Sequence, residues 1–189
     1  MVLNQQTYTA DDLWDLANQE AYYNKRLYLI EGALYVMAPA SWLHGDIALE
    51  IGSLLRNHVR SHGLGRTTAA ETGYILAEGT VLAPDVGFIA SERIPNEIPV
   101  GFVPFAPDLA VEVVSPNDRA SDVQQKVETY LKYGTKMVWV IDPNRNTVAV
   151  YRPATEGASV TFLDIDDQLS GDDIVPGFVC LIRELFPNK

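Results

Sequence analysis

The clearest pattern of hydrophobic and polar positions covers residues 42–61, where apolar side chains recur every three or four positions. This spacing gathers them on one face of an amphipathic helix. The apolar positions are Ile47, Ile51, Leu54, Leu55 and Val59. Ser41 suits the start of such a helix and Gly63 its end, so the pattern predicts one long helix with a single buried face.

Three further helices are expected. Residues 118–133 show a second amphipathic pattern, which Gly134 would close. Its inner face would carry Val123, Val127, Tyr130 and Leu131. Shorter helices are predicted at about residues 9–19, where Thr9 is a suitable cap, and at about residues 181–186.

Extended patterns separate these helices. Residues 109–114 form a continuous apolar run, which is typical of a strand buried on both faces at the centre of a sheet. Other strands are expected at residues 67–77 and 81–90, joined at Glu78-Gly79, at residues 137–141, 147–151 and 159–165, and in a hairpin at residues 26–37 that turns at Glu31-Gly32. The order predicts an α/β fold in which helices flank a central mixed sheet, with an N-terminal hairpin.

The composition fits one globular domain over residues 1–189, since 47% of the residues are hydrophobic and 21% are charged. The formal net charge of −11 repels nucleic acid at long range, so any contact with nucleic acid must be local. Cys180 is the only cysteine, which excludes an intrachain disulfide and favours a reducing, cytoplasmic location. The first residues lack the pattern of a signal peptide and no run is long enough to span a bilayer, so we expect no membrane association.

Two carboxylates interrupt apolar strands. Asp85 stands directly before Val86-Gly87-Phe88-Ile89, and Glu112 lies inside the run at residues 109–114. An ionised carboxylate among apolar neighbours loses hydration that a cation or several donors must restore, so the two strands together suggest a shared metal, with Mg²⁺ as the natural candidate. Two simpler interpretations stay open: Asp85 caps a turn, and backbone donors satisfy Glu112.

A lysine on the following helix is expected to reach the same place. Glu112 and Val114 face the same side of their strand, and a basic group at the second position would normally complete a hydrolytic metal site. Lys126 lies on the helix that folds back along this strand. With a rise of about 3.3 Å per strand residue and about 1.5 Å per helix residue, Glu112 and Lys126 end at similar height. The alternative is that Lys126 pairs with Asp122, one helical turn earlier.

A histidine and a basic segment are the other candidates. His44 lies in the first turn of its helix on the apolar side, so it points inward, either as a buried histidine bonded to the backbone or as part of the cleft. Residues 51–70 contain no Asp or Glu but do contain Arg56, Arg60 and Arg66. This segment is either a solvated helix end or the place of phosphate contacts.

Several short motifs resemble those of a known group. They are Pro84-Asp85, Glu112-Val113-Val114-Ser115-Pro116, the helix with Asp122 and Lys126, and Tyr133-Gly134 through Trp139-Val140-Ile141-Asp142-Pro143. They are similar to the bacterial restriction-endonuclease domain family of otherwise unknown function, which belongs to the PD-(D/E)XK phosphodiesterase superfamily. The predicted hairpin and the Pro39, Ser41 and His44 pattern after it also match, so the resemblance covers nearly the whole chain.

The resemblance implies a restriction-endonuclease-like fold. It implies Asp85 and Glu112 as metal ligands, and Lys126 as a lysine that has moved from the strand onto the helix. Members of the family often carry an acidic residue where this chain has Tyr28 and another near Ala33. That departure leaves Glu31 as the nearby carboxylate of the hairpin.

Together these observations predict a nuclease that binds Mg²⁺ or Mn²⁺ and cleaves phosphodiester bonds in DNA. Asp85 and Glu112 would hold the metal with a carbonyl near Val113, and Lys126 would orient the attacking water or stabilise charge on phosphorus. A homodimer would supply the two active sites that cutting both strands of a duplex requires. The alternative is a catalytically inactive, acidic homodimeric interaction module that retains the nuclease fold.

Overall fold

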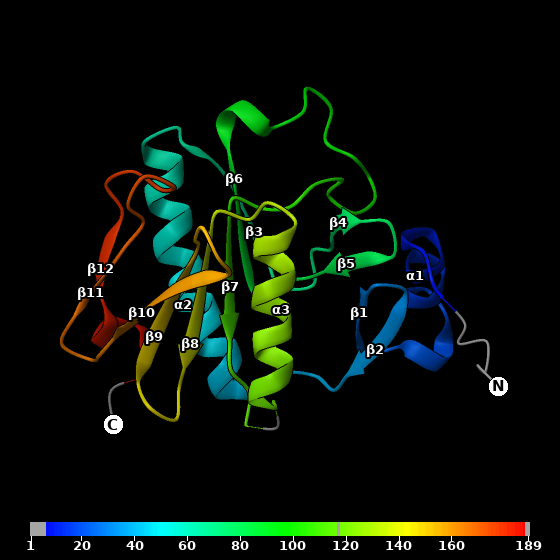
Figure 1. Ribbon diagram of the computed structural model, residues 1–189, viewed down its shortest axis with the longest axis horizontal. Helices are drawn as coiled ribbons and strands as arrows, with labels where there is room; N and C mark the ends of the chain where they lie inside the picture. Colours follow the sequence, from blue (N-terminus) through cyan, green and yellow to red (C-terminus); the bar gives the residue numbers. More distant parts are fainter. Residues whose placement is uncertain (1–6, 117, 188–189) are drawn as a thin grey trace.

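The computed structural model describes residues 7–116 and 118–187 (Figure 1). Within these residues the α-helices are α1 (Ala10–Ala17), α2 (Trp42–Ser61) and α3 (Ala120–Lys132), and the 3₁₀-helices are η1 (Glu20–Tyr22), η2 (Ser91–Arg93) and η3 (Ile182–Leu185). The side chains of Thr9 and Ser41 accept hydrogen bonds from backbone N–H groups in the first turns of α1 and α2. Both predicted caps are therefore confirmed.

A six-stranded mixed sheet forms the centre of the molecule, in the order β10-β9-β8-β7-β6-β3. Its strands are β3 (Gly65–Ala69), β6 (Val86–Ala90), β7 (Leu109–Val113), β8 (Met137–Asp142), β9 (Thr147–Pro153) and β10 (Ala158–Leu163). β7 and β8 are parallel, and the other neighbours are antiparallel. Every residue of β7 is buried, which confirms the prediction of a central strand at residues 109–114.

A smaller antiparallel sheet lies beside α3 (Figure 1). Its order is β2-β1-β5-β4, and its strands are β1 (Arg26–Ile30), β2 (Ala33–Met37), β4 (Tyr74–Ala77) and β5 (Thr80–Leu82). β1 and β2 form the predicted hairpin. Its turn at Glu31-Gly32 has positive φ at both residues, 50° and 80°, which is the geometry that two-residue hairpin loops favour.

α2 and α3 cover opposite faces of the six-stranded sheet, with α3 on the near side in Figure 1. The apolar stripe of α2 packs on Val86, Phe88, Val111, Val113 and Trp139, whereas Val127 and Tyr130 of α3 pack on Ala110, Val138, Tyr28 and Ile30. Successive strand residues face opposite sides of a sheet, so β7 directs Val113 toward α2 and Glu112 toward α3. Glu112 is thus enclosed between the large sheet, α3 and the hairpin.

Two predicted strands are wrong in extent. Residues 67–77 were expected as one strand and residues 81–90 as another, but each is divided between the two sheets. The first breaks after β3, where Glu71 has a positive φ of 69°. The second breaks at Ala83-Pro84-Asp85, where proline has no N–H to offer a sheet. The chain therefore passes from the small sheet into the large one directly before Asp85.

The C-terminal part adds structure that the pattern did not predict. β11 (Gln168–Ser170) and β12 (Val179–Leu181) form a separate two-stranded sheet, and the expected terminal helix is the short 3₁₀-helix η3. α3 begins at Ala120 rather than at Asp118, because the Asp118 carboxylate accepts the N–H of Ser115 in the preceding turn. Across residues 7–116 and 118–187, no helix combines the length and apolar character that a bilayer crossing requires.

Candidate active site

The two sequence-predicted carboxylates meet where the two sheets join. β6 and β7 run antiparallel with Val86 opposite Val111, which places Asp85 opposite Glu112. The N–H of Asp85 donates to the carbonyl of Val111 at 2.9 Å, and the N–H of Val113 donates to Asp85 Oδ2 at 2.8 Å. Backbone contacts on both sides therefore fix the position of this carboxylate.

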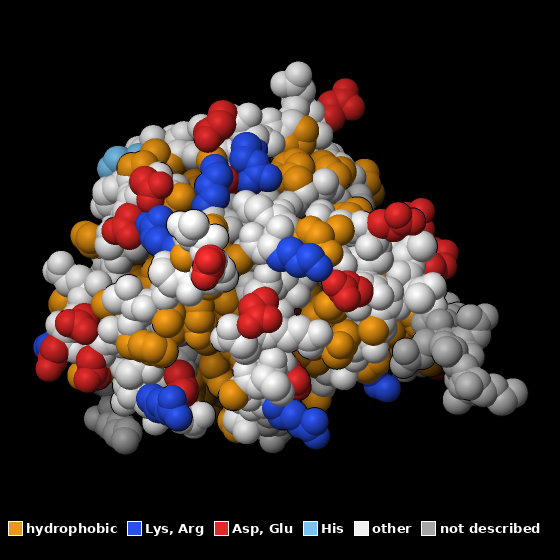
Figure 2. Space-filling model, viewed as in Figure 1, with side chains coloured by type: hydrophobic (Ala, Val, Ile, Leu, Met, Phe, Trp, Pro, Cys, Tyr) orange, Lys and Arg blue, Asp and Glu red, His pale blue; other side chains and the backbone are white. Residues whose placement is uncertain are grey.

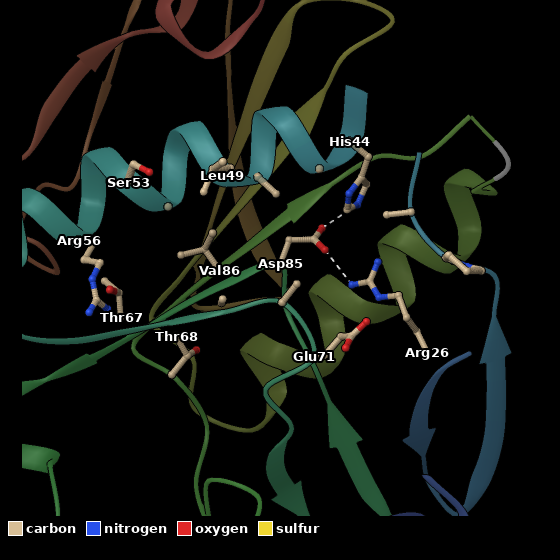
Figure 3. Close-up of a pocket in the computed structure, with 17 residues that line it drawn as sticks. Arg26, His44, Leu49, Ser53, Arg56, Thr67, Thr68, Glu71, Asp85 and Val86 are labelled. Carbon is tan, nitrogen blue, oxygen red and sulfur yellow. Dashed lines mark hydrogen bonds and ion pairs between the residues drawn. The ribbon is translucent and has the colours of Figure 1, made fainter. Parts of the chain in front are cut away.

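Asp85 is 2% exposed and has two side-chain partners, shown in Figure 3. Arg26 Nη2 lies 2.8 Å from Oδ1, and His44 Nε2 lies 3.1 Å from Oδ2. Burial raises the pKa of Asp85, but His44, Arg26 and the Val113 N–H outweigh it and hold the pKa below its ordinary value. The carboxylate is therefore ionised at neutral pH.

Glu112 is 6% exposed and also has two side-chain partners. Lys126 Nζ lies 2.7 Å from Oε2, and the Tyr130 hydroxyl donates to Oε1 at 2.9 Å. Burial raises the pKa of Glu112, Lys126 opposes that effect, and the charge of Asp85 adds to it, with a net rise. The two carboxylates are close enough to affect each other electrostatically.

Lys126 faces Glu112 rather than solvent. Its ammonium group also stands 5.2 Å from the centre of the Tyr28 ring, a distance suited to a cation–π contact. Burial lowers the pKa of Lys126, but the Glu112 carboxylate more than compensates and the pKa lies above its ordinary value. Of the two interpretations of Lys126, the structure thus shows the contact with Glu112.

Two cavities open on either side of the carboxylates. Asp85, His44 and Arg26 line a cavity of about 390 Å³ between α2 and β3. Lys126 and Tyr28 line a second cavity of about 260 Å³. Asp85 therefore borders the first cavity and Lys126 the second, whereas Glu112 lines neither of them.

The carboxylate oxygens of Asp85 and Glu112 are ligands of the type that a hard divalent cation prefers. Mg²⁺ is usually held by one or two carboxylates, with water and substrate phosphate completing its coordination. A carboxylate has about four acceptor positions, of which protein donors use three at Asp85 and two at Glu112. Among the described residues, no group of three His, Cys, Asp or Glu side chains could hold a metal alone. Positions for a shared cation remain, and Arg26 would compete for one of them.

His44 is 4% exposed and projects from the first turn of α2. Its Nε2 contacts Asp85, while its buried Nδ1 has no hydrogen-bond partner among the residues that the structure describes. Of the two open interpretations of His44, the structure thus shows contact with a carboxylate of the cleft rather than with the backbone. This contact brings His44 into the cluster with Asp85.

The remaining predicted residues have different surroundings. The Val113 side chain packs in the core beneath α2, and its N–H rather than its carbonyl contacts Asp85. Arg56, Arg60 and Arg66 are exposed and line one hollow together, next to the cavity that contains Asp85. Glu31 is exposed and pairs with Lys132 at 2.9 Å, away from the carboxylates.

Sequence reasoning missed two members of the cluster. Tyr130 follows Lys126 by one helical turn, so the helical spacing was a signal that could have identified it. Arg26 is 59 residues from Asp85 in the chain, and no local pattern connects the two. The small sheet alone brings Arg26 to the site.

Comparisons with known proteins identify the family of this chain. The model of the Uma2 family, described as "Putative restriction endonuclease", matches residues 14–183. The chain belongs to the Uma2 family. The resemblance inferred from its short motifs is thus confirmed, and the match includes every residue of the cluster.

A solved structure shows the same fold. It is described as a "putative nuclease belonging to DUF820" from Anabaena variabilis ATCC 29413, and it is 26% identical to this Uma2 chain. The similarity covers 95% of this chain and 97% of the other, with a TM-score of 0.76. The comparison with curated proteins gave no match. The predicted mixed α/β, nuclease-like fold is confirmed.

Proposed function

We propose that this Uma2-family chain is a divalent-metal-dependent nuclease that hydrolyses phosphodiester bonds in DNA. The observation that carries the proposal is the cluster of Asp85, Glu112 and Lys126 at the junction of the two sheets, where Asp85 borders a cavity. Two carboxylates and an ammonium group supply a hydrolytic site with ligands for a cation and a donor for water or phosphate. The family membership supports the same conclusion.

Asp85 and Glu112 would hold Mg²⁺ or Mn²⁺, and a carbonyl near Val113 is proposed as a further ligand. When bound, the cation would polarise the phosphoryl oxygen and lower the pKa of a water molecule. His44 and the Val113 N–H fix Asp85, and Tyr130 fixes Glu112, so neither carboxylate needs to reorganise.

Lys126 would donate from its ammonium group to the attacking water or to a phosphate oxygen. Water oxygen forms a bond to phosphorus as one P–O ester bond breaks, the attacking water releases a proton to solvent, and the leaving oxygen takes up a proton from solvent. The Lys126 ammonium group lies 5.2 Å from the centre of the Tyr28 ring and 2.7 Å from Glu112 Oε2. With a substrate phosphate at the carboxylates, this positive charge would stand beside the phosphoryl oxygens on which negative charge develops during attack.

A second candidate function is a catalytically inactive, acidic homodimeric module. The observation that favours it is that protein cations already pair with both carboxylates, Arg26 with Asp85 and Lys126 with Glu112. Val160 and Phe162 are exposed on β10, an edge strand of the large sheet, and would suit contact between two copies.

A cleavage assay on mixed DNA and RNA substrates discriminates the two. The nuclease should cut DNA in the presence of Mg²⁺ or Mn²⁺, and Asp85→Asn and Glu112→Gln should abolish cutting. Calorimetry should show Mn²⁺ binding that the double variant loses. Absence of cleavage on every substrate, together with a dimer by analytical ultracentrifugation, would establish the inactive module instead.

A further inference from the structure

A continuous groove leads away from the candidate active site between α2 and β3. Its first half is the cavity that contains Asp85, and its second half is the hollow lined by Arg60 and Arg66. The two halves share Arg56 and Thr67. We name it the α2–β3 groove. From Gly45 to Arg60 it follows about 22 Å of helix, at about 1.5 Å per residue.

Beyond Asp85 with its partners and the exposed Glu71, the first half of the α2–β3 groove is mainly apolar. Leu49 of α2 and Val86 line it, and Leu49 is 70% exposed (Figure 3). A side chain added at Gly45 would meet nothing within 4 Å, so the groove has free space beside this glycine. The volume of about 390 Å³ falls within the range of roughly 300–1,000 Å³ that is usual for small-molecule sites.

The second half of the α2–β3 groove is basic. Arg56, Arg60 and Arg66 are all exposed there, and Ser91 and Thr67 add hydroxyl groups. Residues 51–70 contain no Asp or Glu, although the whole chain has a net charge of −11. The face that carries α3 differs, because acidic and basic side chains are interspersed on it (Figure 2). Starting from Asp85, the groove therefore has an apolar half followed by a cationic half.

We infer that the α2–β3 groove binds one unpaired polynucleotide strand, an assignment that rests on the proposed nuclease function. Phosphates contact Arg56, Arg60 and Arg66, and a base occupies the apolar half next to Leu49. An apolar wall gains by burying the face of an unpaired base, which a base inside a duplex cannot present. At physiological ionic strength the Debye length is about 8 Å, so these arginines outweigh distant acidic groups.

The charge half of the assignment is tested by fluorescence anisotropy of a labelled single-stranded oligonucleotide in EDTA at several salt concentrations. Replacing Arg56, Arg60 and Arg66 with Gln should reduce the slope of log affinity against log salt by about 2, since each phosphate contact on a single strand contributes about 0.7. The control replaces Lys132, Arg145 and Arg183, exposed cations outside the groove, with Gln. An unchanged slope in the first variant, or an equal change in the control, would overturn the assignment.

The apolar half is tested by filling it. Gly45→Leu adds a side chain into open space, and leucine favours a helix over glycine, so the variant should melt at a higher temperature. We expect its affinity for a single strand to fall about tenfold and its weaker affinity for a duplex of equal length to stay unchanged. Unaltered single-strand binding by this stabilised variant would contradict a base in the groove.

Matched DNA and RNA strands identify which sugar the groove accepts. Because binding is measured without metal, its outcome is independent of cleavage. If the protein binds a single strand through the arginines but cleaves no substrate, the proposed nuclease function is contradicted and strand binding in the groove is supported. If the protein shows metal-dependent cleavage but the arginine variant has an unchanged salt slope, strand binding in the groove is contradicted and the nuclease function is supported. Wild type that binds neither single strand would overturn the groove.

Discussion

Two clusters around buried carboxylates lie at opposite ends of the antiparallel strands β6 and β7. One is the candidate active site with Asp85 and Glu112. The other contains Asp108, directly before β7, which accepts the N–H of Ala90 at 2.9 Å. Arg93 and Lys136 lie 2.9 and 2.8 Å from its Oδ1. Both clusters bury a carboxylate with partners, but their arrangements differ.

Asp108 stands as a single carboxylate between two cations that reach solvent, and the Lys136 side chain is 51% exposed. Asp85 instead faces a second carboxylate, and the cations beside that pair are more enclosed, with Lys126 12% exposed. Two facing carboxylates repel unless a cation is shared, so folding alone does not favour such a pair. The comparison teaches that a buried ion pair is weak evidence of function, whereas two facing carboxylates, one of which borders a cavity, are stronger evidence.

The largest contrast is expected from the lysine in each cluster. Lys126→Met should lower the cleavage rate by about 10²–10³-fold, because it removes a donor aimed at the developing charge. Lys136→Met should change the rate less than about twofold, since its ammonium group pairs with Asp108, at the far end of β6 and β7 from the candidate active site. Initial rates at saturating DNA provide the measurement, with melting curves to verify folding. Equal losses in the two variants would remove the distinction between the clusters.

For the free energy of unfolding, a substitution in the Asp108 cluster should have the larger effect. Asp108→Asn should lower the free energy of unfolding by about 2–3 kcal/mol, because it weakens the hydrogen bond from Ala90 and removes the ion pairs with Arg93 and Lys136. Asp85→Asn should cost less, because it also removes repulsion with Glu112. Urea unfolding monitored by tryptophan fluorescence compares them. A larger loss for Asp85→Asn would indicate that Asp85 is mainly a structural residue.

The Asp108 contribution should depend on pH. Burial raises the pKa of Asp108, but the Ala90 N–H, Lys136 and Arg93 outweigh it, so the folded-state pKa lies below the ordinary value of 3.8. A lowered carboxyl pKa stabilises the fold above the ordinary value, and that stability is lost as the pH falls through the folded-state pKa. The difference in unfolding free energy between wild type and Asp108→Asn should therefore shrink below about pH 4. A constant difference from pH 7 to pH 3 would contradict this cause.

The smallest effect concerns Arg26, whose guanidinium group uses one acceptor position of Asp85. Arg26→Gln should strengthen Mn²⁺ binding about tenfold, since it removes a competing charge-assisted hydrogen bond worth roughly 1.5 kcal/mol. Isothermal titration calorimetry is the measurement. Lys25→Gln, an exposed neighbour, removes the same charge and should leave the affinity nearly unchanged. Weaker binding by Arg26→Gln would mean that Arg26 organises the metal site rather than competes with the metal.

Local patterns were sufficient for much of the fold. The apolar spacing of residues 42–61 predicted α2 with the bounds that the structure has, and the continuous run at residues 109–114 predicted the buried central strand. These predictions succeed because helical spacing and strand burial depend on residues that are near one another in the chain. The same reasoning identified Asp85, Glu112 and Lys126 as candidates, and strand and helix rises put Lys126 level with Glu112.

What the local pattern could not determine is how separate segments meet. Residues 67–77 and 81–90 look like two continuous strands, and only the pairing of β4 and β5 with the hairpin divides them between two sheets. Arg26 reaches Asp85, and Arg66 reaches Arg60 across the α2–β3 groove, because distant elements pack together. The sequence by itself determined the elements and the carboxylates, since neighbouring residues specify them. The tertiary structure decided which cations surround the carboxylates and where the groove runs, because those contacts depend on packing between segments far apart in the chain.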